Sequence, residues 1–189
     1  MGRVIVIEFL SLDGVMQDPD GRVGSDRGGW AFRYGPAAVA GDKFKLGEVL
    51  DSGALLLGRA TWQLFAGIWP SRDDAFSNKM NSIPKLVASR SLERVEEWQN
   101  SSLIAGDLVD EVARRKADQD LVVAGSASVV RTLMEHDLVD EYRLLVFPLV
   151  LGEGSRLFDH GIAPIDLRLV SAEPAGPAVL SVYSRATER

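Results

Sequence analysis

The sequence predicts a single α/β domain over residues 1–189, with a mixed, mainly parallel central sheet, helices on both faces and a C-terminal antiparallel hairpin. Three observations lead to this fold class. The length of 189 residues fits one domain. Short runs rich in Val, Ile and Leu alternate with helical patterns, which is typical of parallel sheets covered by helices. Two β-rich stretches surround a Pro-Ala-Gly-Pro turn near the end of the chain and predict the hairpin.

The first part of the chain contains a strand, a long loop and a helical pattern. Residues 3–10 are rich in Val and Ile and end at the turn Ser11-Leu12-Asp13-Gly14, as a buried strand does. Residues 18–36 contain five glycines and predict an irregular loop, whose alternating aromatic residues suggest that it covers something apolar. Apolar residues at helical spacing predict a helix within residues 37–50.

The rest of the chain repeats the strand–helix pattern up to the closing hairpin. We expect strands at residues 54–57, 85–88, 102–104, 121–124, 141–148, 166–173 and 179–184. Helices are predicted to begin at Arg59, to extend from the capping residue Asp107 to about residue 119, and to cover residues 127–135.

The composition restricts the classes of function. The chain has no cysteine, which excludes disulfides, zinc thiolate sites and cysteine nucleophiles, and nothing in the sequence implies a metal. The net charge of −6 argues against a nucleic-acid partner, because such surfaces are basic. The longest apolar run, residues 144–151, is much shorter than the roughly 20 residues of a membrane helix, so we expect no membrane partner and a cytoplasmic location.

Glycine-rich or polar turns follow three of the predicted strands. The residues concerned are Gly58, Arg59 and Thr61 after the first, Ser89 and Arg90 after the second, and Gly125, Ser126, Ala127 and Ser128 after the third. Ligands of open α/β sheets bind outside the carboxyl ends of strands, and helix N-termini and arginines bind phosphate. Each turn alone could equally be a packing or solvent-exposed feature. Together the three turns predict a nucleotide-binding site.

These turns also resemble motifs of the dihydrofolate reductase-like superfamily. They resemble in particular the stand-alone proteins similar to the reductase (C-terminal) domain of the bifunctional riboflavin-biosynthesis deaminase–reductase. The matching pieces occur in family order and are Ser11-Leu12-Asp13-Gly14-Val15, Leu57-Gly58-Arg59-Ala60-Thr61-Trp62, Ala88-Ser89-Arg90, Ala124-Gly125-Ser126-Ala127-Ser128 and Phe147-Pro148-Leu149-Val150-Leu151-Gly152-Glu153-Gly154.

The resemblance implies that NADPH is the hydride donor and that the protein is a homodimer. It assigns Gly58, Arg59 and Thr61 to the cofactor phosphates and Ser89 and Arg90 to the adenosine 2′-phosphate. It further implies that Gly125, Ser126, Ala127 and Ser128 cover the pyrophosphate and that the turn with Val15 and Met16 borders the nicotinamide. Dihydrofolate reductases have two adjacent glycines after the fifth strand, and here the second is Ser126.

Two carboxylates are the catalytic candidates. In dihydrofolate reductases an acid on the helix before the Gly-Arg-x-Thr-Trp motif orients the pterin and helps to supply a proton, and Asp42 falls at the corresponding place. Asp13, in the turn beside the expected nicotinamide, is the second candidate. Asp42 could instead be an ordinary acid in the first turn of a helix, where the helix dipole favours a negative charge. Asp13 could instead serve only to form the turn. Glu8 alternates with apolar neighbours and could also face the cleft.

These features predict an NADPH-dependent reductase that transfers a hydride to a small pterin- or pyrimidine-type heterocycle. The resemblance is to the 5-amino-6-(5-phosphoribosylamino)uracil reductases of riboflavin biosynthesis. The alternative is a non-catalytic NADP(H)-binding protein of the same fold. The expected partners are a small-molecule substrate and a second copy of the chain, for which residues 147–151 could form a dimer edge or else belong to a buried central strand.

Overall fold

The structure is a computed structural model that describes residues 2–186, and the chain forms two compact units. The first unit contains residues 2–6 and 46–140, and the second contains residues 7–45 and 141–186. The strand order is β4-β3-β2-β5-β1-β6-β8-β7, and β1 (Val4–Ser11) runs through both units. The predicted mixed, mainly parallel sheet with a C-terminal antiparallel hairpin is confirmed. That the whole chain is a single domain stays a prediction.

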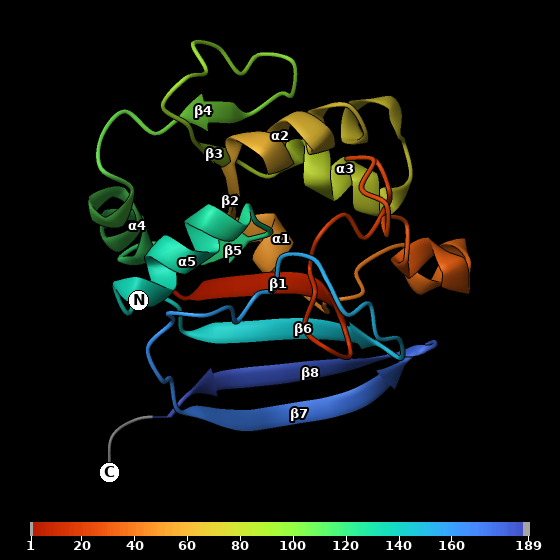
Figure 1. Ribbon diagram of the computed structural model, residues 1–189. Coiled ribbons are helices and arrows are strands. Elements are labelled where there is room, and N and C mark those ends of the chain that lie inside the picture. Colours follow the sequence, from red (N-terminus) through yellow and green to blue (C-terminus); the bar gives the residue numbers. More distant parts are fainter. Residues whose placement is uncertain (1, 187–189) are drawn as a thin grey trace. The chain divides into compact units, whose positions relative to one another are not determined.

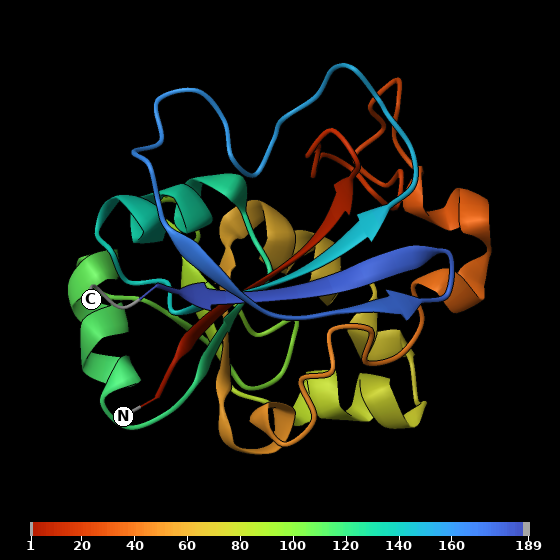
Figure 2. The ribbon, with the colours of Figure 1, turned by 90° about the horizontal axis from the view of Figure 1, so that it is seen from below.

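Parallel strands form the centre of the first unit (Figure 1). They are β2 (Ala54–Gly58), β3 (Lys85–Ala88), β4 (Ser101–Leu103), β5 (Leu121–Val123) and the beginning of β1. The helices are α1 (Val49–Ser52), α2 (Arg59–Ala66), η3 (Trp69–Ser71), α3 (Ala75–Ser82), α4 (Leu108–Lys116) and α5 (Ala127–Glu135). Figure 2 shows α5 on one side of these strands and α1 and α3 on the other. Every residue of β2 and β5 is buried, which explains their continuous apolar sequences.

The C-terminal strands of the second unit pair in an antiparallel manner. Strand β6 (Glu141–Phe147) pairs with β8 (Ala178–Arg185), which pairs with β7 (Leu167–Ala175), and the short helices are η1 (Ala31–Tyr34) and η2 (Pro36–Ala38). The long loop after β1 covers an apolar residue, as expected. The rings of Trp30 and Tyr34 contact Phe147 at centroid distances of 5.7 and 5.4 Å, whereas Phe32 is exposed. Of residues 147–151, Phe147 belongs to β6 and is buried, whereas the other four follow the strand and include the exposed Pro148 and Val150, so the stretch is not a buried strand as a whole. That it forms a dimer edge stays a prediction.

The predicted helix over residues 37–50 is wrong. This segment consists of η2, several turns and the four-residue helix α1. Gly41, Lys45 and Gly47 have positive φ angles, which no α-helix accommodates. The apolar residues Phe44 and Leu46 are nevertheless buried. The apolar pattern therefore predicted correctly that these residues are buried, but not that they form a helix. Helix α4 also ends three residues earlier than predicted, and α3 was not predicted.

Within residues 2–186, no helix is both long enough and apolar enough to cross a membrane.

Candidate functional site

The three turns predicted to bind a nucleotide meet at one edge of the first unit. Gly58, at the end of β2, lies opposite Ala88, at the end of β3, in a parallel register. The amide of Gly58 donates a hydrogen bond of 3.1 Å to the carbonyl of Gly125, which follows β5. Nη1 of Arg59 donates to Oγ of Ser91 at 2.9 Å. Three neighbouring strands therefore bring their carboxyl ends, with Arg59, Arg90 and Gly125, to the same edge.

Gly58 and Ser126 approach each other so closely that only glycine fits at position 58. A Cβ atom on Gly58 would lie 2.0 Å from Oγ of Ser126 and 3.0 Å from its backbone nitrogen. The peptide bond between Gly125 and Ser126 is cis. Oγ of Ser126 lies 3.3 Å from Oγ of Ser128, so two hydroxyls stand together at the start of α5. Serine is thus compatible with the close approach, although dihydrofolate reductases have glycine here.

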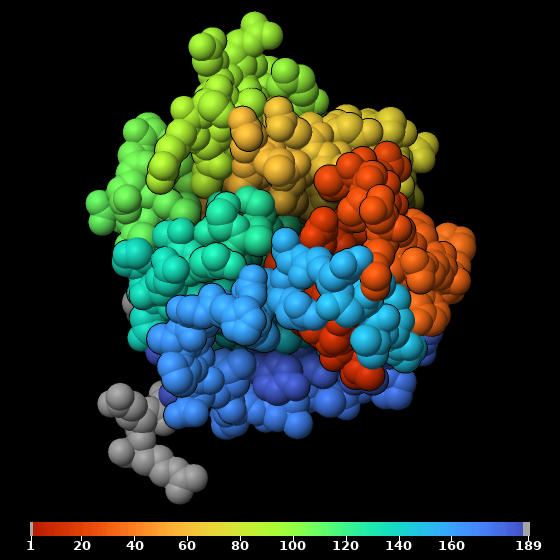
Figure 3. All heavy atoms as spheres, in the orientation of Figure 1, coloured from red at the N-terminus to blue at the C-terminus, as the bar shows by residue number. Residues whose placement is uncertain are grey.

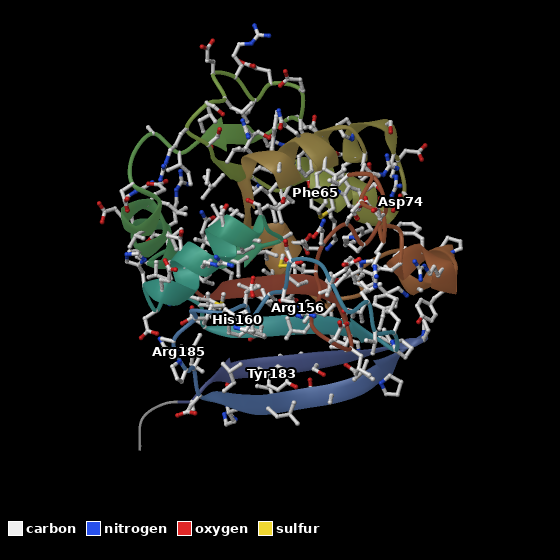
Figure 4. All side chains as sticks on the ribbon, in the orientation of Figure 1. Phe65, Asp74, Arg156, His160, Tyr183 and Arg185 are labelled. Carbon is white, nitrogen blue, oxygen red and sulfur yellow. The ribbon has the colours of Figure 1, made fainter. Side chains whose placement is uncertain are left out.

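The helices that begin at this edge have no side-chain caps. Neither Gly58 before α2 nor Ser126 before α5 makes a side-chain hydrogen bond to the first turn. In contrast, Asp74 caps α3 and Asp107 caps α4, each by accepting two backbone N–H groups; Asp74 is labelled in Figure 4. Free N–H groups at a helix N-terminus favour an anion. The first residues of these two uncapped helices, α2 and α5, are the ones assigned to cofactor phosphates.

The turn after β3 contains hydroxyl groups and an exposed cation. Oγ of Ser89 accepts hydrogen bonds from the amides of Ser91 and Leu92, which fixes the turn and leaves its hydroxyl proton available to a ligand. Arg90 is exposed, and Thr61 in α2 is half-buried. The role of Ser91, which holds Arg59, was not predicted, because only the folded chain places residues 59 and 91 together.

Asp13 is tied to the loop after β6 in the second unit. Its carboxylate accepts hydrogen bonds from Oγ of Ser11 at 2.7 Å and from the amides of Leu151 and Gly152 at 3.1 and 2.8 Å. Arg156, labelled in Figure 4, donates through Nε to the Asp13 carbonyl. The bonds from Ser11 and Leu151 hold the pKa of Asp13 well below its ordinary value. Asp13 is therefore an ionised hydrogen-bond acceptor. This state fits the alternative role of Asp13 in turn formation, and an ionised carboxylate has no proton to donate.

The turn expected to border the nicotinamide is held by the same loop. Val15 is fully buried, and its amide donates to Oγ of Ser11. The amide of Met16 donates to the carbonyl of Ser155. Figure 3 shows the loop after β6, in light blue, lying against the segment after β1, in red. Met16 is only half-buried, so its side chain is more accessible than that of Val15.

Asp42 does not lie on a helix. It is half-buried in a turn, because the helix predicted around it does not form. The helix-dipole interpretation of Asp42 is therefore wrong, and the helix on which its catalytic assignment rested is absent.

Glu8 has an environment opposite to that of Asp13. It lies in β1, and its Oε1 atom is buried without a hydrogen-bond partner. Burial raises the pKa of Glu8 to about 8, so the side chain is mainly a neutral carboxylic acid at pH 7. Carboxyl groups with raised and lowered pKa values thus lie five residues apart.

A mixed sheet of this order, with glycine-led helices at the carboxyl ends of its parallel strands, defines an α/β protein with its candidate site at the strand ends. The model of the RibD C-terminal domain family matches residues 3–181, and the chain belongs to this reductase family. Both the resemblance and the fold inferred from the sequence are confirmed.

Individual relatives agree with this assignment. The chain is 29% identical over 136 residues to the uncharacterized protein YyaP of Bacillus subtilis (strain 168), covering 68% of this chain and 71% of that protein. A Shewanella sp. PV-4 structure, provisionally named a riboflavin biosynthesis protein, superposes with a TM-score of 0.76 at 22% identity, covering 98% of this chain and 99% of the other. The Thermotoga maritima diaminohydroxyphosphoribosylaminopyrimidine deaminase/5-amino-6-(5-phosphoribosylamino)uracil reductase gives a TM-score of 0.60 at 16% identity, covering 98% of this chain and 57% of that one.

Proposed function

We propose that the protein is an NADPH-dependent reductase that transfers a hydride to a small pterin- or pyrimidine-type heterocycle. The observation that carries the proposal is the convergence of three anion-compatible turns at one edge of the first unit. Its membership in the RibD C-terminal domain family supports the same reaction class. NADPH, when bound, supplies the hydride, so the protein needs only to bind the cofactor and the substrate, to align them and to protonate the substrate.

The residues of the edge fit the phosphates of a dinucleotide. The uncapped first turns of α2 and α5 offer backbone N–H groups, and Ser126 and Ser128 add hydroxyls. Arg90, exposed beside the Ser89 hydroxyl, suits the doubly charged 2′-phosphate, which arginine can contact with two parallel hydrogen bonds. Arg59 is already oriented by Ser91 and needs little reorganisation to meet a phosphate.

The substrate proposed first is a pyrimidine carrying a phosphorylated sugar chain, by analogy with the printed activity of the Thermotoga maritima relative. A homodimer and a cytoplasmic location belong to the same proposal. The non-catalytic NADP(H)-binding alternative uses the same edge and differs only in lacking turnover.

Two measurements test the proposal. Titration with NADPH, followed by tryptophan fluorescence, should show saturable binding that is weaker for NADH. Loss of NADPH absorbance should then appear with at least one member of a panel containing 5-amino-6-(5-phosphoribosylamino)uracil, 7,8-dihydropterin and a benzoquinone. Binding without turnover on the whole panel would favour the non-catalytic alternative. Absence of NADPH binding would reject both.

A further inference from the structure

Oε1 of the Glu8 carboxyl group is buried and has no hydrogen-bond partner among residues 2–186. Glu8 interrupts the apolar sequence of β1, and the residue as a whole is half-buried. Among the buried side-chain polar atoms of residues 2–186, two lack a hydrogen-bond partner, Oε1 of Glu8 and Nε1 of Trp69. Buried polar groups are nearly always hydrogen-bonded, because an unpaired one costs about 1–3 kcal/mol. An unpaired acid in a central strand therefore calls for a ligand that completes its hydrogen bonding.

The position of Glu8 along β1 supports a functional role. Val6 of β1 pairs with Val123 of β5 in a parallel register. Glu8 comes two residues after Val6 and three residues before Ser11, the last residue of β1. Glu8 is thus located in the half of its own strand that leads to the carboxyl end. Ligands of open α/β sheets bind at these strand ends.

The other two acids considered for the substrate side do not meet the requirement for a proton donor. Asp13 is ionised and its oxygens are occupied by Ser11, Leu151 and Gly152. Asp42 lies in a turn and has an interaction of its own. Glu8 combines burial, an unoccupied oxygen and a protonated state at neutral pH. A general acid works best when its pKa lies near the working pH.

We propose that Glu8 is the catalytic acid of the reductase and donates the proton that accompanies hydride transfer. This inference rests on the proposed function. Addition of the hydride of NADPH to the carbon of a substrate C=N bond breaks its π bond and places an electron pair on nitrogen. The O–H bond of Glu8 breaks as a new N–H bond forms on that nitrogen. NADP⁺ and a Glu8 carboxylate remain, and the carboxylate regains a proton from water.

Glu8→Gln tests this role, because it keeps the size and removes the acid. The rate of 5-amino-6-(5-phosphoribosylamino)uracil reduction should fall about 10²- to 10⁴-fold, the usual contribution of general acid catalysis. The dissociation constant of NADPH should stay within about twofold, since the phosphate-binding turns are untouched. Glu173→Gln on β7, a half-buried acid of the same unit that is ion-paired with Lys45, is the matched control and should keep the wild-type rate.

Infrared spectroscopy provides a readout independent of turnover. At pH 7 the wild-type protein should show the carbonyl band of a protonated carboxylic acid, and Glu8→Gln should lack it. Glu8→Asp serves as a second variant if Glu8→Gln does not fold, and it should keep the band and lose about tenfold in rate because the acid is withdrawn by one methylene.

The outcomes separate this inference from the proposed function. An active wild-type protein with an equally active Glu8→Gln, or without the infrared band, would reject Glu8 as the acid and leave the reductase assignment in place. A wild-type protein that binds NADPH but reduces none of the panel would overturn both.

Discussion

The two units of the molecule carry different kinds of chemical group. The candidate residues of the first unit are backbone amides, hydroxyls and guanidinium groups at the ends of parallel strands. Those of the second unit are two carboxyls, Glu8 and Asp13, whose environments shift their pKa values in opposite directions. Groups of the first kind bind anions, and an acid with a raised pKa donates protons. The proposed function uses this difference, with phosphate binding in the first unit and proton transfer in the second.

Gly58→Ala should produce the largest effect, because it blocks the phosphate-binding edge directly. The added methyl group would lie 2.0 Å from Oγ of Ser126 and 3.0 Å from its backbone nitrogen, so the Ser126 side chain must rotate or β2 or the start of α5 must move. We expect NADPH affinity to fall at least about 100-fold and the free energy of unfolding to fall by about 1–3 kcal/mol. Isothermal titration calorimetry and chemical denaturation measure the two quantities.

A control and a rescue variant make this test specific. Gly67→Ala places a methyl group no closer than 3.5 Å to a neighbouring atom and should change neither quantity. Ser126→Gly removes the atoms nearest the new methyl group and should restore part of the lost affinity when combined with Gly58→Ala. Unchanged NADPH binding in Gly58→Ala would show that this edge does not hold the cofactor.

Asp13→Asn tests whether the second unit uses this carboxylate for structure. An amide side chain cannot match all the hydrogen bonds that the carboxylate accepts from Ser11, Leu151 and Gly152, and we expect a loss of about 1–3 kcal/mol in the free energy of unfolding. Because the folded pKa lies below the unfolded value of 3.8, the stabilisation is complete well above that pH. It should decline as the pH falls through the folded pKa.

Chemical denaturation of the wild-type protein and of Asp13→Asn at neutral and at strongly acidic pH measures the difference in their free energies of unfolding. This difference should become smaller in acid. Asp26→Asn, an exposed acid in the same unit, is the control and should leave stability nearly unchanged. A stable Asp13→Asn that has lost only turnover would instead return Asp13 to the catalytic role predicted from the sequence.

The two units also differ in how well the sequence predicts them. Strand β2, strand β3 and helix α5 have the predicted bounds within one residue, because buried apolar runs and short-range turn signals determine them. The edge of the first unit was predictable for the same reason, since parallel strands bring their carboxyl ends together. Its one unpredicted member, Ser91, depends on a contact between residues 32 positions apart.

The second unit depends on long-range contacts that local patterns do not show. The partners of Asp13 lie 138 and 139 residues away, and they change a candidate acid into an ionised acceptor. The helix predicted around Asp42 fails because glycines and Lys45 adopt positive φ angles within an apolar pattern. Glu8 was visible as a carboxylate among apolar residues, but its lack of a partner is a property of the folded chain.

Arg90→Ala should affect cofactor choice and little else. If Arg90 contacts the 2′-phosphate, its removal should weaken NADPH binding about 10- to 30-fold and leave NADH binding unchanged, since NADH lacks that phosphate. Arg94→Ala is a suitable control, because Arg94 is also exposed and follows the same strand but has no assigned role. Equal losses for the two cofactors would place Arg90 elsewhere on the dinucleotide.

Lys85 sharpens the comparison because it is a buried base in the first unit, whereas Glu8 is a buried acid in the second. Lys85 is fully buried, and its Nζ donates to the carbonyls of Asn81 and Gln99 at 2.7 and 3.1 Å and lies 4.4 Å from the ring centre of Trp98. Burial lowers the pKa of Lys85 to about 8. Nζ of Lys85 has hydrogen-bond acceptors, whereas Oε1 of Glu8 has no partner in the described part of the chain, so we expect a structural role for Lys85 and no effect on turnover.

The burial of Lys85 predicts a pH dependence of stability that is confined to alkaline pH. Between pH 8 and 10.5 the unfolded lysine is protonated while the folded one loses its proton, so the free energy of unfolding should rise with pH in this window. The slope is at most about 1.4 kcal/mol per pH unit. Lys85→Met should abolish this rise, and Lys43→Met, at a half-buried lysine, should keep it. If Lys85→Met instead removed NADPH turnover while its stability stayed flat, the buried base would belong to the chemistry and the division between the two units would fail.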